Sequence, residues 1–188
     1  MANDARERLL ELLRSRSFER KRVLLASGKE SDFFIDCKET VLTAEGHALA
    51  GEVLLEALAA FAPCDAVAGV ELGGCPLASA VALTSFGRGA SVDAVYVRKE
   101  VKDHGSRRLL EGCGRLAPGA RIALVEDVVT TGGSTLKAVA TLRKARYEVV
   151  GVAALVDRCE GGRQAIENEG IGLVAIFDRG DFLPGPAS

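Results

Sequence analysis

The chain has 188 residues, of which 48% are hydrophobic and 27% are charged, with 24 Lys and Arg against 26 Asp and Glu. This balance is typical of a globular protein with a buried core, and it excludes a disordered or fibrous chain. Because the formal net charge is only -2, we expect no nucleic-acid or membrane partner, and any binding site for an anion must be local.

The length suits a single domain over residues 1–188. Leucines among alternating charges predict a short opening helix within residues 1–13, and these charges interrupt any signal-peptide stretch. We expect residues 1–40 to form a small hood over a larger core and residues 183–188 to form a loose tail. Five cysteines without a C-x-x-C pair favour a reducing compartment, so we expect a cytoplasmic protein.

The core shows a repeated alternation of strands and helices. An amphipathic helix is predicted from Thr43, a favourable N-cap residue, to Pro63, which ends it. Unbroken apolar strands separated by helical patterns predict an α/β fold with a parallel sheet covered on both faces. The predicted strands span residues 66–70, 92–97, 122–125 and 149–156. Ligands bind such sheets at the carboxyl ends of the strands, which confines the search for a site.

The most informative strand end is residues 126–134, EDVVTTGGS, between a predicted strand and a predicted helix. Its glycines allow close approach of an anion, its hydroxyls add donors, and the helix start presents free N–H groups to a phosphate. Glu126 and Asp127 would repel that phosphate, but carboxylates accept hydrogen bonds from ribose hydroxyls or metal-bound waters. The segment therefore predicts a ribose 5-phosphate site; the alternative is an ordinary turn preceded by solvated acids. No Walker A motif is present, which disfavours nucleoside triphosphate hydrolysis.

Other strand ends carry further polar candidates. Residues 98–108 hold five Lys or Arg against two acids, and such a glycine-hinged loop could close as a lid over a diphosphate or simply be a solvated turn. Arg158 could bind a substrate carboxylate or form an internal salt bridge. Phe33 and Phe34 could stack on a ring or belong to the core. No metal-binding motif occurs, so a metal would arrive with a substrate.

Residues 126–134 resemble the signature of type I phosphoribosyltransferases, which bind 5-phosphoribosyl 1-diphosphate. Within that family, residues 26–36, 69–78, 97–105 and 155–161 resemble orotate phosphoribosyltransferases, and the likeness runs through nearly the whole chain. The resemblance implies a central parallel sheet flanked by helices, with an N-terminal hood and a flexible lid loop. It also implies transfer of ribose 5-phosphate to N1 of orotate, giving orotidine 5'-phosphate and pyrophosphate in de novo pyrimidine (UMP) biosynthesis, with Mg²⁺ held mainly through substrate oxygens.

The resemblance also implies residue roles. Lys102 and His104 are expected to assist departure of the diphosphate, with Asp127 as a third catalytic residue. Arg98 and part of the lid are expected to act from the neighbouring subunit, which implies a homodimer. Thr130 to Ser134 would hold the 5-phosphate, Glu126 and Asp127 the ribose hydroxyls, and Thr130 with Arg158 the orotate. The complete expected substrate-binding set is Phe34, Arg98, Lys99, Lys102, His104, Glu126, Asp127, Val128, Val129, Thr130, Thr131, Gly132, Gly133, Ser134 and Arg158.

The sequence departs from the pattern of many members at three positions. Those members have a lysine where this chain has Ala26 and Gly73, and an acid where it has Ser106, although other members share this shorter pattern. Two alternatives stay open: a binding-only relative that senses the ribose donor and regulates transcription, and a transferase for another nucleobase. The lid cations and the acidic net charge favour the orotate enzyme.

Overall fold

The computed structural model describes residues 2–21, 23–24, 30–100 and 108–183. Lys102 and His104 of the predicted lid lie outside the described residues, as do Ala26, Ser106 and residues 184–188 of the predicted tail. Within the described part of the chain, no helix is long and apolar enough to cross a membrane.

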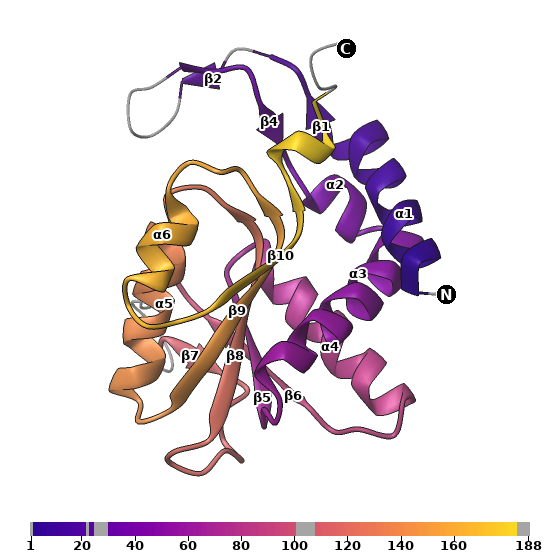
Figure 1. Cartoon of the computed structure of the whole chain (residues 1–188). Coiled ribbons are helices and arrows are strands. Elements are labelled where there is room, and N and C mark those ends of the chain that lie inside the picture. The colour runs from indigo at the N-terminus through magenta and orange to yellow at the C-terminus, as the bar shows by residue number, and fades with distance from the viewer. Residues whose placement is uncertain (1, 22, 25–29, 101–107, 184–188) are drawn as a thin grey trace.

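A six-stranded sheet forms the centre of the molecule, in the order β10-β9-β8-β5-β6-β7 (Figure 1). All neighbouring strands are parallel except β7, which is antiparallel to β6. The predicted α/β fold with a mainly parallel sheet is therefore confirmed. The strands are β5 (Ala66–Val70), β6 (Asp93–Val97), β7 (Leu110–Glu111), β8 (Arg121–Val129), β9 (Glu148–Asp157) and β10 (Leu173–Asp178).

Helices cover both faces of this sheet (Figure 1). Side chains alternate along each strand, so Ala123 and Val125 of β8 join the core beneath α3 and α4, whereas Ile122 and Leu124 join the core beneath α5. Each face of the sheet thus packs against its helices through a separate apolar core. The covering helices are α3 (Ala44–Ala57), which continues as the 3-10 turn η2 (Leu58–Phe61), α4 (Gly74–Gly87), α5 (Gly133–Lys144) and α6 (Gly162–Glu167).

Strand β8 is longer than predicted. The apolar run predicts an end at Val125, but Glu126 and Val128 continue to pair with Ala154 and Val156 of β9. The two acids of the predicted site therefore lie in the strand itself, and only residues 130–132 connect it to α5. The sequence analysis predicts neither α6, which has only six residues, nor β10.

The N-terminal segment lies near the carboxyl ends of the sheet strands (Figure 1). The thiol of Cys37 contacts the carbonyl of Asp127 at 3.8 Å, and Arg179, after β10, pairs with Asp32. Its elements are α1 (Ala2–Leu12), a π-helical turn η1 (Leu13–Ser17), the paired strands β1 (Phe18–Glu19) and β4 (Phe34–Ile35), the paired strands β2 (Val23–Leu24) and β3 (Glu30–Ser31), and α2 (Lys38–Val41).

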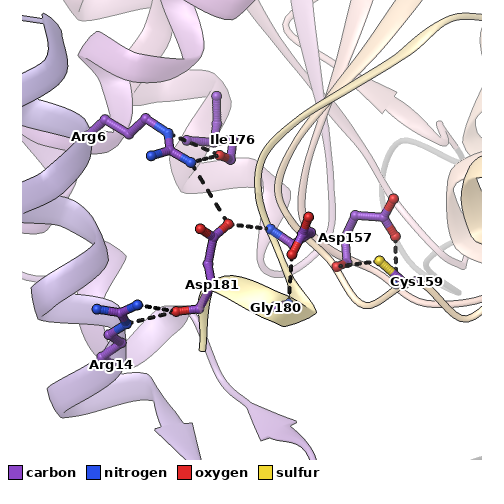
Figure 2. Close-up of polar contacts among 8 residues, drawn as sticks. Arg6, Arg14, Asp157, Cys159, Ile176, Gly180 and Asp181 are labelled. Carbon is purple, nitrogen blue, oxygen red and sulfur yellow. Dashed lines mark hydrogen bonds and ion pairs between the residues drawn. The ribbon is translucent and has the colours of Figure 1, made fainter. Parts of the chain in front are cut away.

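Arginines of α1 and η1 attach the N-terminal segment to β10 and to the turn that follows it (Figure 2). Arg6 donates to the carbonyl of Ile176 at 3.0 and 3.3 Å and lies 3.8 Å from the carboxylate of Asp181. Arg14 donates to the carbonyl of Asp181, which belongs to the 3-10 turn η3 (Arg179–Asp181). These charge-assisted bonds hold the N-terminal segment in place over the strand ends.

Candidate active site

The start of α5 is open to a ligand. Gly132 occupies the N-cap position with φ of +79°, a conformation in which glycine has no steric penalty. Gly132 has no side chain to cap the first turn. Thr131, Gly133 and Ser134 are exposed there. A helix start without an N-cap side chain, together with the positive end of the helix dipole, has the features to which phosphates bind.

The loop before α5 is held by α6 on the opposite side. The backbone N–H of Gly162 donates to the carbonyl of Thr130 at 2.9 Å. A Cβ atom at Gly162 would lie 2.5 Å from the same oxygen, so the close approach requires glycine. Arg158 N–H likewise donates to the carbonyl of Val129 at 2.9 Å. The backbone at Val129 and Thr130 is thus held by hydrogen bonds from the segment that follows β9.

Glu126 lies just before this loop and is only 4% exposed. Its Oε1 accepts hydrogen bonds from the hydroxyls of Ser134 at 3.1 Å and Thr135 at 3.0 Å. Burial, together with the charge of Asp127, raises the pKa of Glu126 to about 7, against the opposing effect of the two hydroxyls and Lys99. Near neutral pH this carboxyl therefore takes up or releases a proton readily.

Asp127 lies beside the turn that precedes α4. Its Oδ1 accepts the N–H of Val128 at 2.9 Å. Burial raises the pKa of Asp127, whereas the Val128 N–H and the charge of Lys38 act against that increase. A Cβ atom at Gly73 would lie 1.9 Å from Asp127 Oδ2. Only a glycine at position 73 allows this carboxylate to lie against the turn.

These groups line one polar pocket of about 290 Å³ at the carboxyl ends of β5 and β8. An adjoining cavity of about 340 Å³ shares Val70, Lys99 and Ser134 with it and extends along α5 to Thr141. The polar pocket thus has a size suited to a small phosphorylated ligand. Its described lining residues are Lys38, Val70, Glu71, Leu72, Gly73, Lys99, Glu126, Asp127, Val128 and Ser134.

Backbone hydrogen bonds anchor the chain on both sides of residues 101–107. Lys99 N–H donates to Glu71 Oε1 at 2.6 Å, and Arg98 N–H donates to the carbonyl of Leu109 at 2.8 Å. The guanidinium of Arg98 also lies 3.7 Å from Glu111. The structure therefore places Lys99 at the polar pocket and Arg98 at the adjoining cavity. The roles predicted for Lys102 and His104 fall on residues outside the described ones.

Arg158 and Phe34 lie outside the described lining of the polar pocket. The buried guanidinium of Arg158 donates to the carbonyl of Phe33 and pairs with Glu160, both at 2.9 Å. The internal salt bridge that the sequence left open is therefore present. Phe33 is a core residue, since its ring is fully buried against Phe18, whereas Phe34 is half-buried. Lys21 Nζ lies over the ring of Phe34, 4.0 Å from its centroid.

The structure thus brings together Glu126, Asp127, Val128, Ser134 and Lys99 from the predicted set. Six contributors to the same site are absent from the predicted set. The strand end with residues 71–74 was one of the places where the sequence predicts a site, but no residue in it was assigned a role. The six are Lys38, Val70, Glu71, Leu72, Gly73 and Thr135. Thr135 directly follows the expected segment 126–134. Its hydroxyl, next to that of Ser134 at the helix start, was the signal in the sequence that could have identified it. Lys38 is distant in sequence from the strand ends, and no local pattern indicates that it reaches them.

Comparison with known proteins shows the family to which the chain belongs. Residues 44–169 match the phosphoribosyl transferase domain. The chain is 69% identical over 179 residues to the orotate phosphoribosyltransferase of Sorangium cellulosum (strain So ce56), covering 95% of this chain and 93% of the relative. It is 45% identical over 181 residues to that of Bradyrhizobium sp. (strain ORS 278), covering 95% of this chain and 97% of the relative.

A solved structure of Mycobacterium tuberculosis H37Rv orotate phosphoribosyltransferase in complex with 5-phospho-alpha-D-ribosyl 1-diphosphate superposes with a TM-score of 0.77. It is 36% identical, and the match covers 95% of this chain and 98% of that one. The phosphoribosyltransferase from Corynebacterium diphtheriae gives a TM-score of 0.81 at 35% identity, covering 95% of this chain and 98% of that one. With the uncapped helix and the paired acids described above, these matches show that the chain belongs to the phosphoribosyltransferase family and, within it, to the orotate phosphoribosyltransferases.

Proposed function

We propose that the polar pocket carries out the reaction of this family, the transfer of ribose 5-phosphate from 5-phosphoribosyl 1-diphosphate to N1 of orotate. The reaction gives orotidine 5'-phosphate and pyrophosphate and belongs to pyrimidine biosynthesis. One observation carries the assignment to this pocket: the uncapped start of α5 and the acid pair Glu126 and Asp127 lie within one connected site. A phosphate site beside hydroxyl acceptors matches the two ends of ribose 5-phosphate.

The two halves of the ribose 5-phosphate group have separate binding residues in this scheme. The backbone N–H groups and hydroxyls of residues 130–134 hold the 5-phosphate. Glu126 and Asp127 accept hydrogen bonds from the ribose hydroxyls, for which an ionised carboxylate is the better acceptor. The hydroxyls of Ser134 and Thr135 keep one oxygen of Glu126 in a fixed orientation. The ribose is thereby held in a defined position, and holding the reactants in line is a main source of rate in such a transfer.

Charge changes during the transfer define the remaining roles. The bond between the anomeric carbon and the diphosphate breaks as the carbon becomes electron-deficient, so the site must stabilise negative charge on the departing diphosphate. We assign this task to Lys99, Lys102 and His104, with Asp127 close to the ribose as a fixed negative charge. The anchoring of Lys99 beside Glu71 supports this assignment for one of the three cations.

The residues present fit a Mg²⁺ ion that binds with its substrate. Among the described residues, no cluster of three or more His, Cys, Asp or Glu is arranged to hold a metal. The pocket nevertheless presents the carboxylates of Glu126 and Asp127, and Mg²⁺ prefers oxygen ligands and keeps several waters. We therefore assign Mg²⁺ mainly to substrate oxygens, with these two carboxylates accepting from its waters. When bound, the ion would neutralise charge on the diphosphate.

Arg158 is the proposed partner of the orotate carboxylate, together with Thr130, while Phe34 is the proposed neighbour of the orotate ring. The support is that Glu160 and the carbonyl of Phe33 hold the Arg158 guanidinium in one orientation near the end of β9. A planar guanidinium binds a carboxylate through two parallel hydrogen bonds, which a lysine cannot form. The Arg158→Lys variant should therefore have a higher KM for orotate and an unchanged KM for the ribose donor.

We also propose a homodimer in which α4 contacts a second copy of the chain. Residues 72–87 contain no charged side chain. Leu83 and Phe86, on one side of this helix, are 70% and 78% exposed. Tyr96 of β6 is joined to the same helix by a hydrogen bond to Ser79, and Arg98 follows two residues later, just after the strand ends. An apolar surface of this kind is typical of a protein contact, and a partner there would lie close to Arg98.

The double variant Leu83→Asp and Phe86→Asp tests this contact. We expect a monomer by light scattering and a large loss of turnover, because Arg98 and the lid are proposed to act across the interface. A dimer that persists in the double variant would contradict the proposed contact through α4.

We also propose a cytoplasmic location. All five cysteines are free thiols, which is typical of proteins in the reducing cytoplasm.

A base-specificity assay tests the function directly. Purified protein with Mg²⁺ and 5-phosphoribosyl 1-diphosphate is mixed in turn with orotate, uracil, adenine or hypoxanthine, and the loss of each base is followed. We expect turnover with orotate alone. Consumption of another base while orotate persists would overturn the substrate, and binding of the donor without turnover of any base would indicate a sensor.

A further inference from the structure

We propose that Lys38 of α2 binds the diphosphate of the ribose donor and is a substrate-binding residue of this site. The inference rests on the proposed function. It assigns to the N-terminal segment, which otherwise lies over the pocket, a direct contact with the leaving group. Three observations carry it: the charges of the pocket, the geometry of position 73, and the anchoring of Lys38 itself.

The described pocket residues have too few cations for a diphosphate. Glu71, Glu126 and Asp127 contribute three carboxylates, whereas Lys38 and Lys99 are the two cations of the described lining. A diphosphate carries several negative charges and binds best to donors that approach from different directions. Lys99 approaches from the end of β6 and Lys38 from α2, so the two lysines come from different elements around the pocket.

The turn before α4 does not contribute a cation to the pocket. Its described residues 71–74 comprise one acid, one leucine and two glycines. A Cβ atom at Gly73 would lie 1.9 Å from Oδ2 and 2.3 Å from Cγ of Asp127, so any side chain there would displace the carboxylate. At position 73 the wall of the pocket is therefore backbone, and the two cations of the described lining, Lys38 and Lys99, both come from outside this turn.

Lys38 is held in place but keeps donors for a ligand. Its Nζ lies 2.6 Å from Asp36 Oδ1, and its backbone N–H donates to the same oxygen at 3.1 Å. The bond to Asp36 raises the pKa of Lys38, and Asp127 adds to this effect, so the ammonium stays charged. An ammonium has three N–H donors, and one of them is directed to Asp36. The side chain is 35% exposed, which leaves it accessible to an anion in the pocket.

Two ligands separate a diphosphate contact from a general effect of charge. Binding of pyrophosphate with Mg²⁺ and binding of ribose 5-phosphate are measured by calorimetry for the wild type, Lys38→Met, Lys38→Arg and Lys144→Met. Lys144 is an exposed lysine at the far end of α5 and serves as a matched control. We expect Lys38→Met to weaken pyrophosphate about 10-fold or more, the loss of one charge-assisted contact, and ribose 5-phosphate less than twofold. Lys38→Arg should recover most of the affinity, and Lys144→Met should resemble the wild type.

The possible results separate the inference from the function it rests on. If Lys38→Met binds pyrophosphate as tightly as Lys144→Met, the inference is wrong while the proposed function stands. If both ligands weaken equally in Lys38→Met and Lys38→Arg fails to recover either, Lys38 has a structural role and the inference is also wrong. If the wild type neither binds pyrophosphate nor consumes orotate, the proposed function fails first. A selective loss of pyrophosphate with recovery by arginine supports the inference.

Discussion

Helices α3 and α5 begin in opposite ways, and the difference separates a stabilising element from a binding element. In α3, the side chain of Thr43 accepts the N–H of Gly46 at 3.1 Å, so the chain itself satisfies part of the helix start. In α5, the corresponding position is Gly132, which has no side chain to offer. The free N–H groups of a helix start need a partner. In α3 the chain supplies that partner, whereas in α5 we propose that the ligand supplies it.

The residues before the two helices differ in the same sense. The cap of α3 is a neutral threonine, whereas α5 follows the buried Glu126 and the half-buried Asp127. Burial raises the pKa of both carboxyls, which means that the folded protein holds them in ionised form only at a cost in free energy. A site of this kind reduces stability in exchange for binding, as is common where activity requires buried polar groups.

The largest effect is expected from a negative charge at the open helix start. Gly133 has an ordinary backbone conformation, and a Cβ atom there would meet only Thr131 Oγ1 at 3.9 Å. Gly133→Asp should therefore fold well, and the acid should even favour the helix dipole slightly. The same charge repels the 5-phosphate, so kcat/KM for the ribose donor should fall about 1,000-fold, or about 4 kcal/mol. Steady-state kinetics and a melting curve measure the two effects.

The control for this variant is Gly133→Asn, which has the same shape without the charge. It should retain most of the affinity for the donor. Equal kinetics for Gly133→Asp and the wild type would show that the phosphate binds elsewhere, and the contrast between α3 and α5 would lose its functional meaning.

The next effect concerns the buried acid. The pKa of Glu126 is raised from 4.5 to about 7 in the folded protein, so folding favours the protonated form. The stability associated with this proton is fully present below pH 4.5 and is lost as the pH rises through about 7. The neutral amide of Glu126→Gln has no such proton to lose. As the pH rises from acid to alkaline, the stability of the variant should therefore increase by about 3 kcal/mol relative to that of the wild type. Chemical denaturation on both sides of this range measures the difference.

The same substitution should weaken binding of the ribose donor. A neutral amide accepts hydrogen bonds from the ribose hydroxyls less well than a carboxylate. For the wild type, kcat/KM for the donor should fall as the pH drops below about 7, because Glu126 becomes protonated. A parallel pH dependence of stability in wild type and variant would show that Glu126 is not the titrating group.

The smallest effect is expected at the capped helix. Thr43→Ala removes the bond to Gly46 and should lower the free energy of unfolding by about 1 kcal/mol. The KM for the ribose donor should not change, because Thr43 is absent from the described lining of both cavities. Urea unfolding and donor kinetics on the same preparation test both statements. A clear rise in KM would contradict the separation between the two helices.

The parts of the fold that the sequence predicts are those with strong local patterns. Residues 66–70 form β5 as predicted, and Thr43 caps α3, because an apolar run and a cap are local signals. The extension of β8 through Glu126 depends on pairing with β9, which brings together residues far apart in sequence. Polar residues at a strand end show no apolar alternation, so the pattern ends too early.

In the candidate site, too, local sequence patterns could be predicted and contacts between distant segments could not. Residues 130–134, the proposed phosphate loop, could be singled out from the sequence because their glycines and hydroxyls are contiguous. Lys38 and the contact of Gly73 with Asp127 were not, since they depend on how α2 and the turn before α4 meet β8. Arg158 shows why local sequence left its role open: its salt bridge partner Glu160 is two residues away, but its contact with Phe33 comes from the N-terminal segment.

Amide chemical shifts during titration with ribose 5-phosphate test the central claim most directly. The ligand contains only the phosphate and the sugar, so the readout does not depend on the lid, on orotate or on turnover. In ¹⁵N spectra of the wild type, we expect the largest changes at Gly132, Gly133 and Ser134, and we expect these changes to disappear in Gly133→Asp. Saturating binding that leaves these three amides unmoved would contradict the account.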